Sequence, residues 1–180
     1  MFSIANQILN VAFCDTSNEK IAITSVPQDY SVEFFDKFDS AFNDKFKKFT
    51  HIIIDEKLKK LYPHIIEGAQ HLFEITAKED NKTVLKTIEV CEFLQEANAD
   101  KSSLVGVIGG GIVQDIGAYA CRTFKRGLPW CYVPTTMLSM TDSCIGGKTG
   151  LNHKKYKNMM ALFSAPTEVL VCTAFLETLE

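Results

Sequence analysis

The sequence lacks long hydrophobic runs, paired cysteine motifs and a strong excess of either charge. No apolar stretch approaches the roughly 20 residues that a membrane-spanning helix needs. The first residues have neither the basic region nor the apolar core of a signal peptide. The formal net charge of −3 gives no electrostatic argument for nucleic-acid binding. We therefore expect a cytoplasmic protein that contacts neither membrane nor nucleic acid.

Metal-binding patterns of cysteine and histidine are also missing from the sequence. The six cysteines are scattered, with no Cys-x-x-Cys, and several stand in apolar segments. The four histidines show no spacing typical of metal ligands. These patterns predict buried free thiols in a reducing compartment and no metal site within this chain.

What the sequence does contain is an alternation of short apolar strands with helical patterns. Its 180 residues are enough for one domain with a sizeable core. Continuous apolar strands that alternate with helices indicate a mainly parallel sheet covered by helices on both faces, a Rossmann-like α/β fold. The strands expected in this sheet are 51–55, 71–76, 104–108, 130–133 and 168–171.

Helices and an additional strand pair are expected between and before these strands. Four phenylalanines at four-residue intervals predict a helix within 31–49, and a second helix is expected over 112–125. Segments 7–13 and 20–26 predict an antiparallel pair of strands around a turn. A third helix, 83–97, is expected to carry on one side Val84, Ile88, Cys91 and Leu94.

Three consecutive glycines, Gly109 to Gly111, connect strand 104–108 to the following helix. Such a turn can present free N–H groups and the positive end of a helix to a pyrophosphate. A tight turn without any ligand explains these glycines equally well. Gln114 stands where the common Gly-x-Gly-x-x-Gly fingerprint needs glycine. Asp115 lies in the first part of the helix, where an acid is favoured in any case.

Segment 134–158 concentrates groups that suit a phosphate. Hydroxyls and glycine-freed N–H groups can donate to phosphate oxygens, and a lysine supplies positive charge. A polar loop with turn glycines is the alternative interpretation of Gly146-Gly147-Lys148 taken alone. The full set of motifs is Thr135-Thr136, Asp142-Ser143, Gly146-Gly147-Lys148 and Lys157-Asn158.

Together, these motifs resemble the 3-dehydroquinate synthase family and, more broadly, the sugar phosphate cyclases. The resemblance runs from about Asp55 to Leu179 and includes the glycine turn with Asp115, then Arg126-Gly127 and the motifs of segment 134–158. It implies an NAD-binding α/β domain followed by a helical domain that binds a divalent metal, zinc or cobalt. By this resemblance, residues 1–180 form the NAD-binding domain and stop after the first residues of the next one, and the metal ligands lie beyond Glu180.

The resemblance also implies an activity. Enzymes of this kind use NAD to assist phosphate elimination from a seven-carbon sugar phosphate, which then closes into a carbocycle by an intramolecular aldol step in the shikimate pathway. Catalysis and substrate binding would fall to Asp142, Lys148 and Asn158. Arg126 would reach the phosphate of a neighbouring subunit's substrate, which implies a homodimer. The implied NAD contacts are Asp55, Glu79, Lys82, Gly110, Gly111, Asp115, Thr135, Thr136, Lys157, Phe175 and Thr178.

Several of these residues have simpler interpretations, and the sequence departs from the family pattern in places. Asp55 can cap the next helix, and Arg126 can favour a helix end. Lys57, Gln114 and the turn at 154–156 replace usual Asn, Gly and Pro-x-Gly.

Other functions also stay open. A related cyclase could use sedoheptulose 7-phosphate or glucose 6-phosphate. A metal-dependent polyol dehydrogenase would share the fold but has no phosphate to expel. A protein of another class would be a non-catalytic NAD-binding remnant, or one half of a split enzyme.

Overall fold

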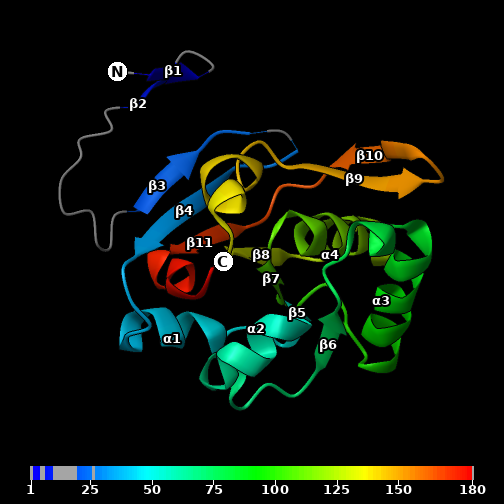
Figure 1. The fold of residues 1–180 in the computed structure, drawn as a ribbon, viewed down its shortest axis with the longest axis horizontal. Coiled ribbons are helices and arrows are strands. Elements are labelled where there is room, and N and C mark those ends of the chain that lie inside the picture. Colours follow the sequence, from blue (N-terminus) through cyan, green and yellow to red (C-terminus); the bar gives the residue numbers. More distant parts are fainter. Residues whose placement is uncertain (1, 5–6, 10–19, 26, 180) are drawn as a thin grey trace.

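A seven-stranded sheet forms the centre of the chain in a computed structural model, which describes residues 2–4, 7–9, 20–25 and 27–179 (Figure 1). The strand order is β3-β4-β11-β8-β7-β5-β6, and all neighbours pair parallel except β3 with β4. The strands are β3 (Lys20–Ile23), β4 (Tyr30–Phe35), β5 (His51–Asp55), β6 (Leu72–Ile75), β7 (Val105–Gly109), β8 (Trp130–Pro134) and β11 (Glu168–Cys172). The expected mainly parallel sheet is therefore confirmed.

Helices cover both faces of this sheet, as expected (Figure 1). The helix α3 (Val84–Glu96) packs with α4 (Gly111–Thr123) on one face, and α1 (Ser40–Phe46) and α2 (Glu56–Leu61) lie on the other. Side chains alternate between the two faces along each strand. In β5, Ile53 belongs to the core under α3 and α4, whereas Ile52 and Ile54 belong to the core under α1 and α2.

The helix α4 is packed closely against β7. A Cβ atom built on Gly117 would lie 2.7 Å from Val107 Cγ1, so only glycine allows this approach of helix and strand. This close packing holds the amino end of α4 at the carboxyl end of β7, where the glycine turn lies.

Two hairpins stand apart from the central sheet. One pairs β1 (Phe2–Ile4) with β2 (Gln7–Leu9), and the other pairs β9 (Lys148–His153) with β10 (Tyr156–Phe163). The second hairpin packs its β9 strand against α4 and bridges to Thr83 at the start of α3. Short 3₁₀ turns lie at η1 (Pro63–Ile66), η2 (Glu79–Asn81), η3 (Phe124–Arg126) and η5 (Thr173–Thr178), and η4 (Ser139–Ser143) is a π-helix.

Two sequence expectations about the first 50 residues are wrong. Tyr30–Phe35 is the strand β4, so the helix begins only at Ser40, where Asp39 accepts a hydrogen bond from the Phe42 N–H. The four-residue phenylalanine spacing was compatible with a helix, but pairing with β11 and β3 decides the structure of Phe34. The strand β3 pairs with β4 and β2 with β1, not with each other; residues 10–19, which hold the expected turn, lie outside the described residues.

The helix expected at 83–97 is confirmed, and of its expected inward residues Leu94 is buried and Val84 and Cys91 pack against the core, whereas Ile88 does not. Thr87, Val90 and Leu94 are buried, whereas Ile88 is 46% exposed. The buried face, which packs against α4, therefore includes Thr87 and Val90 in addition to the expected residues and leaves Ile88 outside.

The described cysteines follow the sequence expectation. Cys121, Cys131, Cys144 and Cys172 are buried free thiols and Cys91 is half-buried; Cys14 lies outside the described part of the chain. Burial raises the pKa of Cys144 and of Cys172 to about 11.

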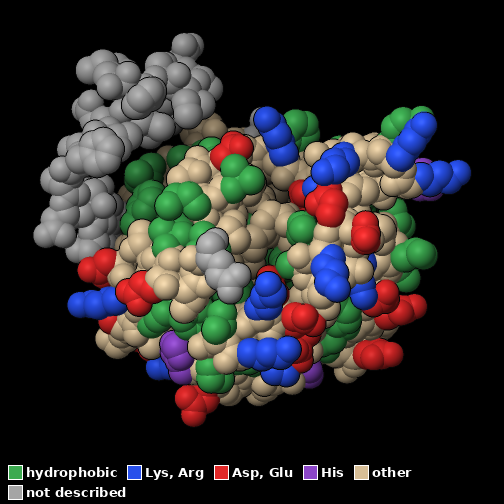
Figure 2. Space-filling view, in the orientation of Figure 1, with side chains coloured by type: hydrophobic (Ala, Val, Ile, Leu, Met, Phe, Trp, Pro, Cys, Tyr) green, Lys and Arg blue, Asp and Glu red, His purple; other side chains and the backbone are tan. Residues whose placement is uncertain are grey.

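Basic and acidic side chains are interspersed on the face shown in Figure 2. In the described ranges, no helix is both long and apolar enough to cross a membrane.

Candidate active site

Two cavities lie on either side of the amino end of α4, at the carboxyl edge of the sheet. The strand-end cavity, about 490 Å³, lies where β5, β7, β8 and β11 end. The hairpin cavity, about 540 Å³, lies between α4, the π-helix η4 and the β9–β10 hairpin. The α4 helix contributes Gly111 and Ile112 to the first cavity and Asp115 to the second, so its first turns form part of both walls.

The strand-end cavity gathers seven of the eleven predicted NAD contacts. The seven that line it are Asp55, Gly110, Gly111, Thr135, Thr136, Phe175 and Thr178. They come from four segments far apart in the sequence, which the parallel strands bring to one edge. The cavity is also lined by Lys57, the residue at which the sequence departs from the family pattern.

The glycine turn places backbone against the strand-end cavity. Gly110 caps the amino end of α4, and a Cβ atom there would lie 3.0 Å from Thr136 Cγ2. Thr136 is itself fixed, because its N–H donates to Ser139 Oγ at 3.0 Å and the Ser139 hydroxyl donates to its carbonyl at 2.8 Å. This turn thus keeps helix N–H groups near a cavity wall, which suits an anionic group.

Asp55 caps a helix and also faces the strand-end cavity. Its carboxylate accepts a hydrogen bond from the Lys57 N–H at 3.0 Å and so caps α2, while it also lines the strand-end cavity. Burial raises the pKa of Asp55, although the Lys57 N–H and charge act against that shift. On the opposite wall, Thr178 shares a hydrogen bond of 2.6 Å with Tyr62.

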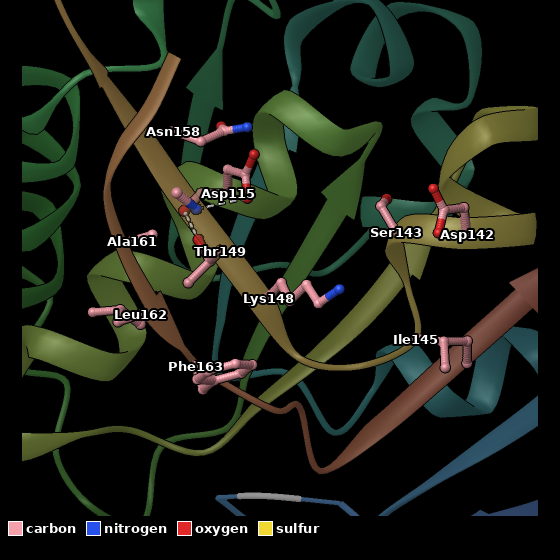
Figure 3. A pocket seen from close by; sticks show the side chains of 11 residues that line it. Asp115, Asp142, Ser143, Ile145, Lys148, Thr149, Asn158, Ala161, Leu162 and Phe163 are labelled. Atoms are coloured by element: carbon pink, nitrogen blue, oxygen red, sulfur yellow. Dashed lines mark hydrogen bonds between the residues drawn. The ribbon is translucent and has the colours of Figure 1, made fainter. Parts of the chain in front are cut away.

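The hairpin cavity brings together the three predicted substrate residues. Asp142, Lys148 and Asn158 all line it (Figure 3). Figure 3 shows Lys148 between Asp115 and Asn158 on one side and Asp142 and Ser143 on the other. Lys148 begins β9, and Asn158 projects from β10 in a left-handed conformation with φ of 52°.

A buried ionic network fixes one wall of this cavity. Lys82 Nζ lies 2.5 Å from Asp115 Oδ2 and donates to Asn158 Oδ1 at 2.7 Å. Asp115 also accepts from the Gly150 N–H at 3.1 Å. Burial raises the pKa of Asp115, and the contacts with Lys82 and Gly150 oppose that rise.

Lys82, Glu79 and Lys157 are predicted NAD contacts that line neither cavity. Glu79 accepts from Asn152 Nδ2 at 2.8 Å, and Lys157 Nζ lies 3.7 Å from Glu79 Oε1. The hydrogen bond from Asn152, with the charges of Lys82 and Lys157, lowers the pKa of Glu79. These contacts connect η2 to the β9–β10 hairpin at the edge of the site.

Arg126 lies away from both cavities. It lines a separate cavity of about 310 Å³ with Arg122 and Trp130, at the amino end of β8. Arg126 follows α4 in a left-handed conformation with φ of 66°. The structure therefore keeps Arg126 out of this chain's own candidate site.

Sequence reasoning missed the β9–β10 hairpin and the wall it provides. Ala161, Leu162 and Phe163 line the hairpin cavity from β10, and Thr149 and Gly150 line it from β9. The signal was weak, because β10 is largely exposed and shows no alternating burial. In the part of the chain that the structure describes, no group of three or more His, Cys, Asp or Glu could hold a metal ion.

Comparisons with known proteins fit this geometry. The family model described as 3-dehydroquinate synthase N-terminal matches residues 72–180. A 3-dehydroquinate synthase from Clostridium tetani (strain Massachusetts / E88) is 37% identical over 153 residues, which cover 81% of this chain and 41% of that protein. The chain thus spans less than half the length of this curated relative.

Solved structures show the same fold. A 2-epi-5-epi-valiolone synthase from Streptomyces hygroscopicus subsp. jinggangensis 5008, solved with NAD+ and Zn2+, matches with a TM-score of 0.77 and 28% identity, over 84% of this chain and 45% of that chain. A 2-deoxy-scyllo-inosose synthase, solved with carbaglucose-6-phosphate, NAD+ and Co2+, also gives 0.77 at 19% identity, over 89% and 48% of the two chains. At that lower identity the match supports the fold alone.

Proposed function

The chain belongs to the 3-dehydroquinate synthase family, and from this we propose that it forms the NAD-binding part of a cyclase of that type. The reaction would eliminate phosphate from a seven-carbon sugar phosphate with the help of NAD and close the carbocycle by an intramolecular aldol step. One observation carries the proposal: the first turns of α4 form part of the walls of two cavities with complementary chemistry.

We propose the strand-end cavity as the NAD site, because its residues fit that cofactor. The glycine turn leaves the amino end of α4 open to a pyrophosphate, and Gly110 has no room for a side chain beside Thr136. Asp55 offers a carboxylate at the end of β5, where it can accept hydrogen bonds from ribose hydroxyls. When bound, NAD+ supplies a reversible hydride acceptor for a substrate hydroxyl.

The hairpin cavity would hold the sugar phosphate. The Lys148 ammonium can neutralise a phosphate group, and the Asp142 carboxylate can accept hydrogen bonds from sugar hydroxyls. Because Asn158 Oδ1 accepts from Lys82, its Nδ2 group is left to donate to a substrate oxygen. The apolar β10 wall, from Ala161 to Phe163, limits access of water to one side.

Arg126 supports a homodimer as a further part of this proposal. It lies at the opposite edge of the sheet from the hairpin cavity, so it would act on the phosphate bound by a partner subunit. Residues 1–180 would act as one NAD-binding domain of a cytoplasmic enzyme. The described residues hold no group of three or more ligands for a metal, so a divalent metal, zinc or cobalt, would be held by other parts of the complete protein.

Calorimetric titration of this chain tests the proposal directly. NAD+ should bind, and Lys148→Ala should weaken binding of inorganic phosphate at least tenfold while changing NAD+ affinity less than twofold. A chain that fails to bind NAD+ would show that the strand-end cavity has another use. In the full-length protein, Lys148→Ala should also abolish phosphate release from the seven-carbon sugar phosphate.

A cyclase with a different sugar phosphate is a second candidate. Residues 154–156, which depart from the family pattern, form the turn between β9 and β10 and the first residue of β10. Parallel assays with three substrates would distinguish these cyclases: the sugar phosphate that 3-dehydroquinate synthases use, sedoheptulose 7-phosphate and glucose 6-phosphate.

A further inference from the structure

Gln114 is a buried amide beside the candidate site that the proposed function leaves without a role. Its side chain is 3% exposed, and it precedes Asp115 in α4. A buried amide requires hydrogen-bond partners, since an unsatisfied one costs about 1–3 kcal/mol. The hydrogen-bond partners of Gln114 therefore indicate which part of the structure this residue fixes.

Gln114 and Ser143 make two reciprocal hydrogen bonds. Gln114 Nε2 donates to the Ser143 carbonyl at 2.7 Å, and the Ser143 hydroxyl donates to Gln114 Oε1 at 2.8 Å. The pair joins segments 29 residues apart and uses both ends of the amide. Two bonds to one residue fix its orientation as well as its distance.

Ser143 ends the π-helix η4, and its neighbour Asp142 lines the hairpin cavity. The last carbonyls of a helix have no partner within that helix. Gln114 supplies a donor to one of them. Single-turn π-helices are rare and are often found at functional sites, where they place a side chain that a regular helix would not.

We propose that Gln114 is a positioning residue, which sets the place of Asp142 in the hairpin cavity by clamping Ser143 to α4. The inference rests on the proposed function, in which Asp142 contacts the sugar phosphate. A residue without a side-chain amide or carboxyl group at this position could not make both bonds. The clamp links α4, which borders both cavities, to the wall that carries Asp142.

Ligand titration of the chain tests this role. Gln114→Met keeps most of the side-chain volume but removes both hydrogen bonds. We expect it to weaken binding of the seven-carbon sugar phosphate about tenfold, while NAD+ affinity changes less than twofold. Gln28→Met is a control for the loss of two hydrogen bonds at an exposed position, because Gln28 also donates to two carbonyls, Ala165 and Pro166, but away from both cavities.

Amide hydrogen exchange gives a readout that does not depend on any ligand. The N–H groups of Cys144 and Ile145 donate to the carbonyls of Ser139 and Asp142, both in η4, at 3.0 and 3.1 Å. In Gln114→Met these two amides should exchange about tenfold faster, and amides in the middle of α3 should be unchanged. Unchanged exchange at Cys144 and Ile145 would overturn the proposal, even if the wild-type chain bound no sugar phosphate and the proposed function had failed.

The pH dependence of sugar phosphate binding by Gln114→Glu distinguishes a role of Gln114 in positioning Asp142 from a role in core packing alone. A protonated carboxyl group can reproduce both bonds, whereas a carboxylate would face the Ser143 carbonyl. Sugar phosphate binding by Gln114→Glu should therefore recover at low pH relative to wild type at the same pH. Equal losses of NAD+ and sugar phosphate binding in Gln114→Met, or the same effect in Gln28→Met, would show a merely structural role.

Discussion

The two cavities are built by different kinds of contact, although they share the first turns of α4. Two groups of the strand-end cavity are held by close neighbours in the sequence: Asp55 bonds two residues on, and Thr136 bonds three residues on, whereas Thr178 is held by the distant Tyr62. Groups of the hairpin cavity are held across long stretches, since Lys82 reaches Asn158 over 76 residues. Both cavities exist only when distant segments have assembled, and the hairpin cavity depends in addition on an ionic network that joins distant residues.

The largest expected effect comes from breaking the long-range network at Lys82. Lys82→Met would leave Asp115, whose side chain is 18% exposed, without its cation. Removal of one partner from a buried ion pair costs roughly 3–5 kcal/mol. Urea unfolding should show a loss in this range, and Lys82→Met/Asp115→Asn should recover part of it. A loss below about 1 kcal/mol would mean that the network does not hold the hairpin.

A smaller effect is expected in the glycine turn of the strand-end cavity. In Gly110→Ala, the new Cβ would lie 3.0 Å from Thr136 Cγ2, and Thr136 cannot move freely because Ser139 holds it. Overpacking of this kind costs about 1–3 kcal/mol. We expect lower NAD+ affinity by calorimetry and a lower unfolding midpoint. Gly111→Ala is the stability control, because its Cβ would meet only Ser143 Oγ at 3.8 Å.

The local cap at Asp55 should contribute less still. Asp55→Ala removes the hydrogen bond to the Lys57 N–H, and loss of such a cap costs about 1 kcal/mol. Asparagine caps helices as well as aspartate does, so Asp55→Asn should stay within about 0.5 kcal/mol of wild type. If both variants lost NAD+ affinity to the same extent while only Asp55→Ala lost stability, the carboxylate would have both functions.

The smallest effect should come from Glu79 at the edge of the hairpin. Its pKa is lowered in the folded state, so its carboxylate stabilises the fold above the unfolded pKa, and this contribution disappears as pH falls through the folded pKa. The side chain is 44% exposed, so solvent screening limits the effect to below about 0.5 kcal/mol. Glu79→Gln should flatten the stability–pH curve below pH 5 by about that amount. A larger change in the free energy of unfolding would mean that the contacts of Glu79 with the hairpin stabilise the fold nearly as much as those of Lys82.

The same contrast explains what could be predicted from the sequence. Strands 51–55 and 104–108, the glycine turn and the capping role of Asp55 depend on neighbouring residues, and local patterns were enough to predict them. The gathering of Asp142, Lys148 and Asn158 was expected only through the family resemblance, and the structure places them around one cavity.

Features that depend on contacts between distant segments could not be predicted from local sequence patterns. Phe34 fits a helical stripe equally well until β11 and β3 pair with its segment. The contact between Gln114 and Ser143 has no local signal, because each residue alone is an ordinary polar side chain. The inward face of α3 likewise depends on the packing of α4, which places Val90 inside and Ile88 outside.

The left-handed backbone of Asn158 limits which residues this position tolerates. Its φ of 52° disfavours most side chains, and asparagine and glycine are the common residues in this conformation. Glycine would keep the turn of the backbone but lose the amide that Lys82 orients, whereas glutamine would keep an amide and strain the backbone. Position 158 is therefore restricted twice, once by shape and once by chemistry, and asparagine alone satisfies both restrictions.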